Sequence, residues 1–179
     1  MIPLGVLASS RVAPSPVVST WSGGAPSTRG YWPNTTTWKK MDPPQIGRSS
    51  WITQLAGLRW ASMPIPPGSV ITAATLAFKT SAAQTSPGAA SNRAGVHQVD
   101  AAPELASGQQ TTDWPPTTGW TPTDAGAKSV DLTAAVQALV NRPGWTNGSP
   151  VVVRVQGNTA GASGLADLTD VTLTVTYTN

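Results

Sequence analysis

Tryptophan is the residue type in this sequence best suited to recognise a ligand. The chain of 179 residues contains eight Trp, two Tyr and one Phe. An exposed indole offers a flat apolar plate with one N–H donor, and the C–H face of a sugar ring stacks well on such a plate. Five aromatic residues among Ser, Gly, Thr and Pro are therefore candidate glycan-binding residues: Tyr31, Trp32, Trp38, Trp114 and Trp120. The alternative is that they cover an edge of the domain or a subunit interface.

The remaining tryptophans are interpreted differently. Trp60 and Trp145 lie in apolar, strand-like or helix-adjacent segments and are expected to pack in the core, and Trp51 is interpreted in the same way. Trp21 lies in polar surroundings like those of the five candidates.

Side chains for catalysis are scarce, so we expect no enzyme and no catalytic residues. His97 is the single histidine, and no Gly-x-Ser-x-Gly elbow is present. The chain has no cysteine, which excludes disulfides, thiol catalysis and Cys-ligated zinc. Asp167 and Asp170 occur together in GLADLTD but form no Asp-x-Asp-x-Asp-Gly loop. We expect no cofactor, with a structural calcium ion as the alternative.

Charge is unevenly distributed along the chain. The net charge is +3, and residues 1–90 hold seven Lys and Arg against the one acid Asp42, whereas residues 91–179 hold four against seven acids. We interpret this as a solvated surface with two-sided polarity. A basic face that meets an acidic neighbour or an anionic envelope is the alternative. Nucleic-acid binding is not expected, because only Lys39 and Lys40 are adjacent.

Composition favours an all-β domain. Gly and Pro number 17 each, and charged residues make up 11% of the chain. Gly and Pro break helices, whereas the abundant Thr and Val favour strands. No apolar run approaches the roughly 20 residues that span a bilayer, so no membrane insertion is expected. The apolar start lacks a basic region ahead of it, and we expect no secretory signal.

Hydrophobic patterning predicts several strands. A turn at 66–68 leads into a strand at Val70–Lys79, and further strands are expected at Ser49–Trp60 and Ala94–Val99. Residues 150–157 and 170–178 form two closing strands. In the last strand, alternation places four residues on one face: Val171, Leu173, Val175 and Tyr177. One apolar face per strand implies a two-sheet β-sandwich.

One short helix is predicted at about 131–141. Asp131 serves as its N-cap, a stripe of Leu and Val forms its apolar face, and Pro143-Gly144 ends it. The stretches 21–51 and 103–127 are expected to be rich in loops.

The chain divides into an arm and a domain. Residues 1–18 form an extended N-terminal arm, because an apolar opening is followed by Pro14 and Pro16. Residues 19–179 form the sandwich. An apolar arm needs a partner surface to bury it, and the candidate docking residues are Ile2, Leu4, Val6 and Leu7. The alternative is that the arm is a first strand of the same domain.

Two long segments resemble a known module. LRWASMPIPPGSVITAATLAFKTSA and DLTAAVQALVNRPGWTNGSPVVVRVQG, followed by LTVTYT, resemble the DNRLRE-type domains of bacterial surface and secreted proteins, which look like carbohydrate-binding modules. The likeness covers roughly residues 48–179. It implies a jelly-roll-like sandwich.

The arm carries a second resemblance. IPLGVLASSRV resembles the N-terminal segment of minor tail proteins of actinobacteriophages, such as those of mycobacteria. Arm and module together imply a virion structural protein at the tail tip that aids recognition of a host-envelope glycan. The implied partners are other tail proteins, envelope polysaccharide and further copies of the chain in a homo-oligomer such as a trimer. The alternatives are a non-catalytic glycan-binding module of a secreted bacterial protein and a capsid decoration protein.

Overall fold

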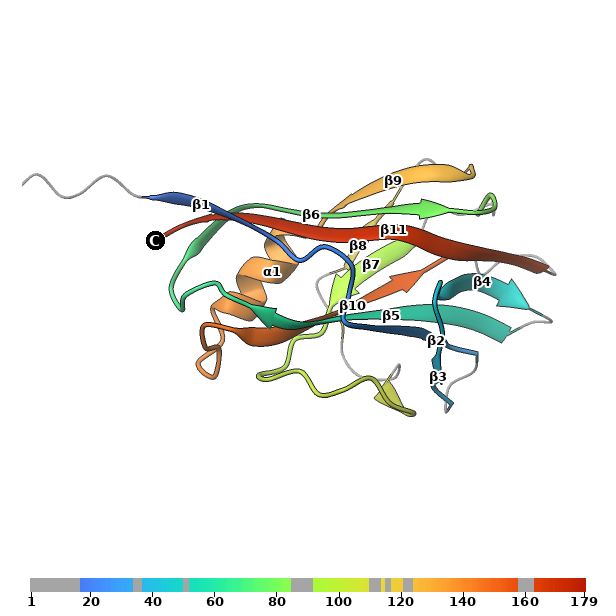
Figure 1. Cartoon of the computed structure of the whole chain (residues 1–179), viewed down its shortest axis with the longest axis horizontal. Coiled ribbons are helices and arrows are strands. Elements are labelled where there is room, and N and C mark those ends of the chain that lie inside the picture. Colours follow the sequence, from blue (N-terminus) through green and yellow to red (C-terminus); the bar gives the residue numbers. More distant parts are fainter. Residues whose placement is uncertain are drawn as a thin grey trace, which may run out of the picture.

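The computed structural model describes residues 17–33, 37–49, 52–84, 92–109, 114, 117–120, 124–157 and 163–179. The fold is all-β with one short helix, as predicted, and its strands pack in two layers (Figure 1). The elements are β1 Val18–Ser22, β2 Thr28–Trp32, β3 Lys39–Lys40, β4 Gln45–Ser49, β5 Ile52–Met63, β6 Val70–Thr80, β7 Arg93–Val96, β8 Thr117–Gly119, β9 Gly126–Asp131, α1 Thr133–Val140, β10 Ser149–Gln156 and β11 Ser163–Thr178.

One layer is built around β11, the longest strand. β6 pairs along one edge of β11, β1 and β4 pair along the other, and β9 extends the layer beyond β6. The second layer places β5 between β2 and β10, with β7 and β8 beyond β10. β4 pairs with both β11 and β5, so it joins the two layers at one end. All of these pairings are antiparallel.

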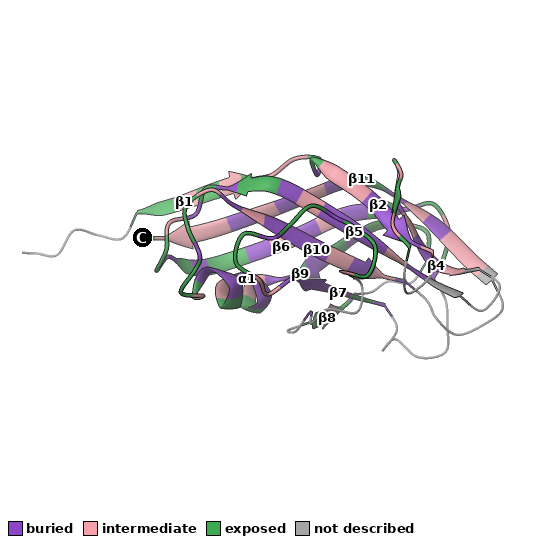
Figure 2. Ribbon diagram, turned by 90° about the horizontal axis from the view of Figure 1, so that it is seen from below, coloured by how far each residue is buried: buried purple, intermediate pink, exposed green. Residues whose placement is uncertain are grey.

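The main core lies between the layers. Alternate residues of β10 and β11 point inward, and Val153, Val155, Leu173 and Val175 are fully buried there. Purple segments along the facing strands of Figure 2 mark this interior. Tyr177 is only partly buried and packs against the core from the end of β11. The alternation predicted for the last strand is therefore confirmed over its inner part.

The helix closes one end of the core. α1 begins at Thr133, two residues later than predicted, because Asp131 is the last residue of β9. The Asp131 carboxylate still accepts bonds from the N–H and hydroxyl of Thr133, at 2.8 and 2.6 Å. These bonds hold the pKa of Asp131 below its usual value. Asp131 therefore binds the first residue of the helix, although it lies one residue before the N-cap position rather than at it.

The two stretches predicted to be rich in loops also contain short strands that the sequence did not indicate. The stretch 21–51 holds the end of β1 and all of β2, β3 and β4, and the stretch 103–127 holds β8 and the start of β9. These strands are short and lack clear alternation, and their partners lie far away in the chain, as in the pairing of Thr28 with Arg59. Such pairing depends on tertiary context that a local pattern does not contain.

Candidate functional site

A gap in the strand pairing of β11 marks the candidate site. β1 pairs with β11 as far as Thr174, and the N–H of Gly23 then donates to the Leu173 carbonyl at 2.9 Å. β4 pairs as far as Asp167, and the N–H of Leu168 donates to the Pro44 carbonyl at 2.8 Å. Among the described residues, no strand covers positions 169–172 on this edge. Because alternate residues point to the same neighbour, the N–H and C=O of Val171 face the gap.

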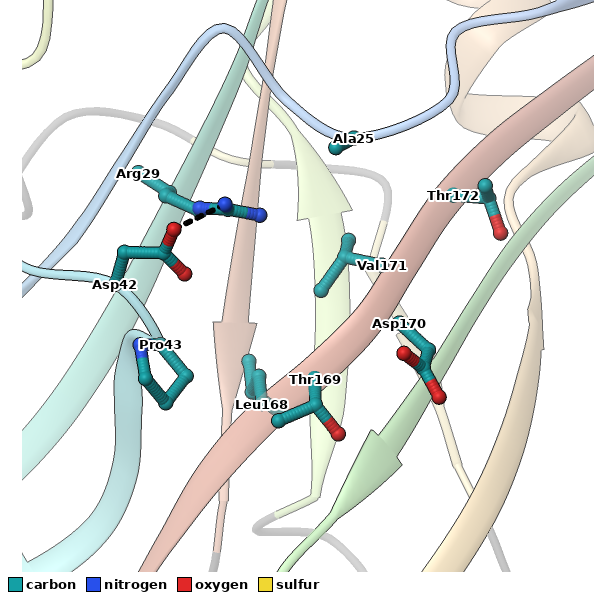
Figure 3. A pocket seen from close by; sticks show the side chains of 9 residues that line it. All are labelled: Ala25, Arg29, Asp42, Pro43, Leu168, Thr169, Asp170, Val171 and Thr172. Carbon is teal, nitrogen blue, oxygen red and sulfur yellow. Dashed lines mark hydrogen bonds and ion pairs between the residues drawn. The ribbon is translucent and has the colours of Figure 1, made fainter.

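An open hollow of about 600 Å³ lies over this gap (Figure 3). Its lining residues come from the β1–β2 loop, β2, the segment before β4, and β11: Ala25, Arg29, Asp42, Pro43, Leu168, Thr169, Asp170, Val171 and Thr172. In Figure 3 the Val171 side chain projects from β11 toward the space between Ala25 and Arg29. A second hollow of about 340 Å³ shares Arg29 and Asp42, so this ion pair stands between the two.

The hollow combines apolar surface with charged walls. Its accessible apolar side chains are those of Ala25, which is exposed, and Pro43, which is partly buried, whereas Leu168 and Val171 are almost fully buried beneath it. The Arg29 guanidinium pairs with the Asp42 carboxylate, and the two side chains keep 29% and 60% of their surface exposed. Both groups therefore retain hydrogen-bonding capacity toward a ligand. An arginine with a carboxylate beside apolar surface suits a neutral polyhydroxylated molecule, whose hydroxyls both donate and accept.

A bulge in β11 shapes the opposite rim. The register with β6 shifts between Thr169 and Thr172, and Asp170 adopts a left-handed backbone with φ of 52°. Aspartate tolerates this conformation better than most residues. The carboxylate of Asp170 pairs with Lys79 on β6 at 2.8 Å, and this bond raises the pKa of Lys79.

The uneven distribution of charge along the sequence is partly balanced by ion pairs between its two halves. Arg59 pairs with Glu104 at 2.8 Å, as Lys79 does with Asp170. Each pair joins a base from the first half to an acid from the second.

The described residues contain no group of three or more side chains arranged to hold a metal ion. Asp167 instead accepts a bond from the Gln45 amide at 3.0 Å. Asp170 is engaged by Lys79. The two acids considered for calcium thus have different partners.

The structure turns the candidate glycan-binding aromatics inward. Trp32, Trp114 and Trp120 expose 2% or less of their surface, Tyr31 exposes 9%, and Trp38 is partly buried. For the first three, this burial fits the alternative that they cover part of the domain and does not fit exposure toward a ligand. As placed here, these rings offer no free plate to a sugar, and none of the five lines the hollow.

Three of these residues belong to a second apolar cluster, on the outer face of β2 and β10. It contains Trp32, Ala102, Leu105, Trp114 and Val152, with Trp38 packed against it. The Trp32 indole donates to the Ala106 carbonyl at 2.9 Å and lies 4.6 Å from the Trp38 ring. Residues 97–109 thus cover this face of the sheet.

His97 and Trp114 stack within the same region. Their rings lie 4.7 Å apart, and the Arg154 guanidinium lies 4.9 Å from the Trp114 ring centre. Burial, reinforced by the nearby charges of Arg154 and Arg142, lowers the pKa of His97. Burial also lowers the pKa of Arg154 to about 10. His97, Trp114 and Arg154 thus form a packed stack.

The other tryptophans serve packing. Trp120 lies in the main core, edge-on to Phe78 at 5.5 Å, and its indole donates to the Gln156 carbonyl. Trp60 and Trp145 are buried as predicted. Trp51 lies outside the described residues.

Of the predicted arm, the structure describes only Val17 and Val18. Its proposed docking residues, Ile2, Leu4, Val6 and Leu7, lie outside the described residues. β1 begins at Val18, one residue before the expected domain boundary. No helix in the described part of the chain is long and apolar enough to cross a membrane.

Comparison of the sequence with models of known protein families found no match, and comparison with curated proteins found none either. The function is therefore argued from the chain itself.

Proposed function

We propose that this protein is a non-catalytic attachment protein of a phage virion, a minor tail protein that binds a host-envelope glycan in the hollow over β11. The observation that carries the binding part is the hollow itself, in which the Arg29–Asp42 pair lies beside the apolar side chains of Ala25 and Pro43, at a strand edge that no described strand pairs with. The tail location rests on the resemblance of residues 2–12.

The chemistry of the hollow suits a sugar better than a charged or apolar ligand. The pairing of Arg29 with Asp42 leaves little net charge to attract an ion. Thr169 and Thr172 add hydroxyls, and the main-chain groups of Val171 add a donor and an acceptor. Sugars need such mixed partners around each hydroxyl, with apolar surface for their C–H groups. No acid pair in the hollow is needed for this role, and we propose binding without turnover.

An open site of this kind gives weak single-site affinity. A dissociation constant of about 1 mM corresponds to about 4 kcal/mol of binding free energy. Several copies displayed on one particle raise the effective concentration and give firm attachment from weak sites.

Sedimentation with isolated actinobacterial cell walls tests the binding site. Arg29→Ala removes one charged wall of the hollow, and we expect about a tenfold loss of bound protein at fixed concentration. Arg142→Ala is the matched control, because Arg142 also pairs with one aspartate, Asp100, and is 35% exposed, but does not line the hollow. Equal binding by Arg29→Ala and the wild type contradicts the site.

Two further results bear on the wider assignment. Labelled antibody that decorates tails supports the tail location, whereas labelling of heads supports the capsid decoration alternative. Release of soluble sugars from the wall polysaccharide by the pure protein contradicts the non-catalytic part of the proposal.

A further inference from the structure

The outer edge of β1 is not paired with any strand that the structure describes. Among the described residues, β1 pairs only with β11, through the register that joins Thr20 to Thr176. In Figure 2 β1 lies at the margin of its layer. The N–H of Gly23 donates to the Leu173 carbonyl, so the odd-numbered residues of this ladder bond to β11. The backbone groups of Val18, Thr20 and Ser22 therefore face away from the sheet.

This edge lacks the usual protection. Natural edge strands carry charges, prolines or bulges that prevent pairing with another chain. Residues 17–25 contain no charged residue and no proline. The exposed large apolar side chains of the described residues all gather here: Val17 at 66%, Val18 at 67% and Val70 at 57%. Val18 and Val70 flank Thr178 in one row of the sheet.

We propose that two copies of the chain associate edge to edge through β1, antiparallel about a two-fold axis at Thr20. Thr20 then lies opposite Thr20 of the second copy, and Val18 lies opposite Ser22. Each copy offers the outward N–H and C=O groups of the same three residues, so the two edges satisfy each other's hydrogen bonds. A second copy fits better than a charged partner, because nothing on this edge complements a charge.

The edge is short, and the dimer is correspondingly weak. Two five-residue strands bury less than the roughly 1,000 Å² expected of a stable interface, so we expect dissociation constants of micromolar or above. Covalent trapping is the suitable detection method.

Disulfide trapping of Thr20→Cys tests the proposed axis. Directly opposed residues that exchange hydrogen bonds have Cα atoms about 5.5 Å apart, within the range that a disulfide spans. The chain has no cysteine of its own, so any bridge involves the introduced thiol. Thr72→Cys is the control, since Thr72 is exposed on β6 of the same layer but lies outside β1 and its proposed interface. We expect at least about tenfold more crosslinked dimer from Thr20→Cys than from Thr72→Cys. Equal or absent crosslinking in both overturns the proposal.

A charge-swap pair provides a second readout in solution. Thr20 is exposed, so Thr20→Lys and Thr20→Glu are expected to leave the fold intact. Each variant alone places like charges opposite each other and is expected to sediment as a monomer at concentrations where the wild type dimerises. A mixture of the two restores the dimer. A wild type that stays monomeric or forms trimers, or a mixture that stays monomeric, overturns the proposal. Arg29→Ala leaves this association unchanged, which separates it from glycan binding.

Discussion

The outer face of β10 and the unpaired edge of β11 teach opposite lessons about exposed sheet surface. On β10 the apolar Val152 is covered by Trp32, Leu105 and Trp114, and the covering loop is fixed by a hydrogen bond from Trp32. On β11 no strand that the structure describes covers the edge at 169–172, and charged groups surround it. The aromatic-rich region is closed, while the region that looks unremarkable in the sequence is open. In this protein the aromatic residues lie on the covered face of β10, whereas the Arg29–Asp42 ion pair lies at the accessible edge of β11.

The largest effect is expected where the closed surface is broken. Trp32→Ala removes a fully buried indole and its bond to Ala106, and should lower the free energy of unfolding by about 3–5 kcal/mol. Urea denaturation measures this loss. Trp38→Ala, at a partly buried ring in contact with Trp32, should cost less. A Trp32→Ala protein with wild-type stability means that the cluster is not a core.

A second prediction concerns the edge of β11, where a neutral side chain replaces Asp170 at the bulge. Asp170→Asn keeps a residue that tolerates the left-handed backbone but removes the charge next to Lys79. We expect little change in stability, because both side chains are largely exposed. Cell-wall binding should fall several-fold. If Asp170→Asn unfolds the protein while the molecules that remain folded bind as the wild type does, then Asp170 supports the fold and not the binding site, and the prediction is wrong.

A smaller effect concerns pH. The pKa of His97 is lowered in the folded state, so the unfolded chain binds the proton more readily. Stability contributed by neutral His97 is present above its ordinary pKa of about 6.5 and is lost as the pH falls through that value toward the lower folded pKa. Urea midpoints at pH 8 and pH 5 should differ more in the wild type than in His97→Gln. Equal pH dependence in the two proteins contradicts the burial of His97 as the cause.

The sequence predicts the fold class and much of the core but misses the site. Strict alternation after residue 170 and the Pro-Gly turn before Val70 are local signals, and both proved reliable. A signal for the bulge was also present, because the buried residues Leu168 and Val171 are three positions apart and break the period of two.

The hollow had no local signal. Nothing in the local sequence around Arg29, Asp42 or Asp170 indicates a site, because these residues come from separate segments that meet through strand pairing. The glycan-binding interpretation of the tryptophans rested on the short polar segments around them, whereas their burial fits the alternative that they cover part of the domain. In the structure these segments include β2 and a loop that folds over the sheet.

An NMR titration of the labelled protein with soluble oligosaccharides from the host cell wall tests the central claim most directly. Backbone amides report on the strand edge, and indole N–H signals report on the tryptophans in the same spectrum. We predict shifts at the amides of residues 169–172 and at Arg29, with the indole signals of Trp32, Trp114 and Trp120 unchanged. Shifts confined to those indoles, with the β11 amides unmoved, would contradict the assignment of the site to the hollow.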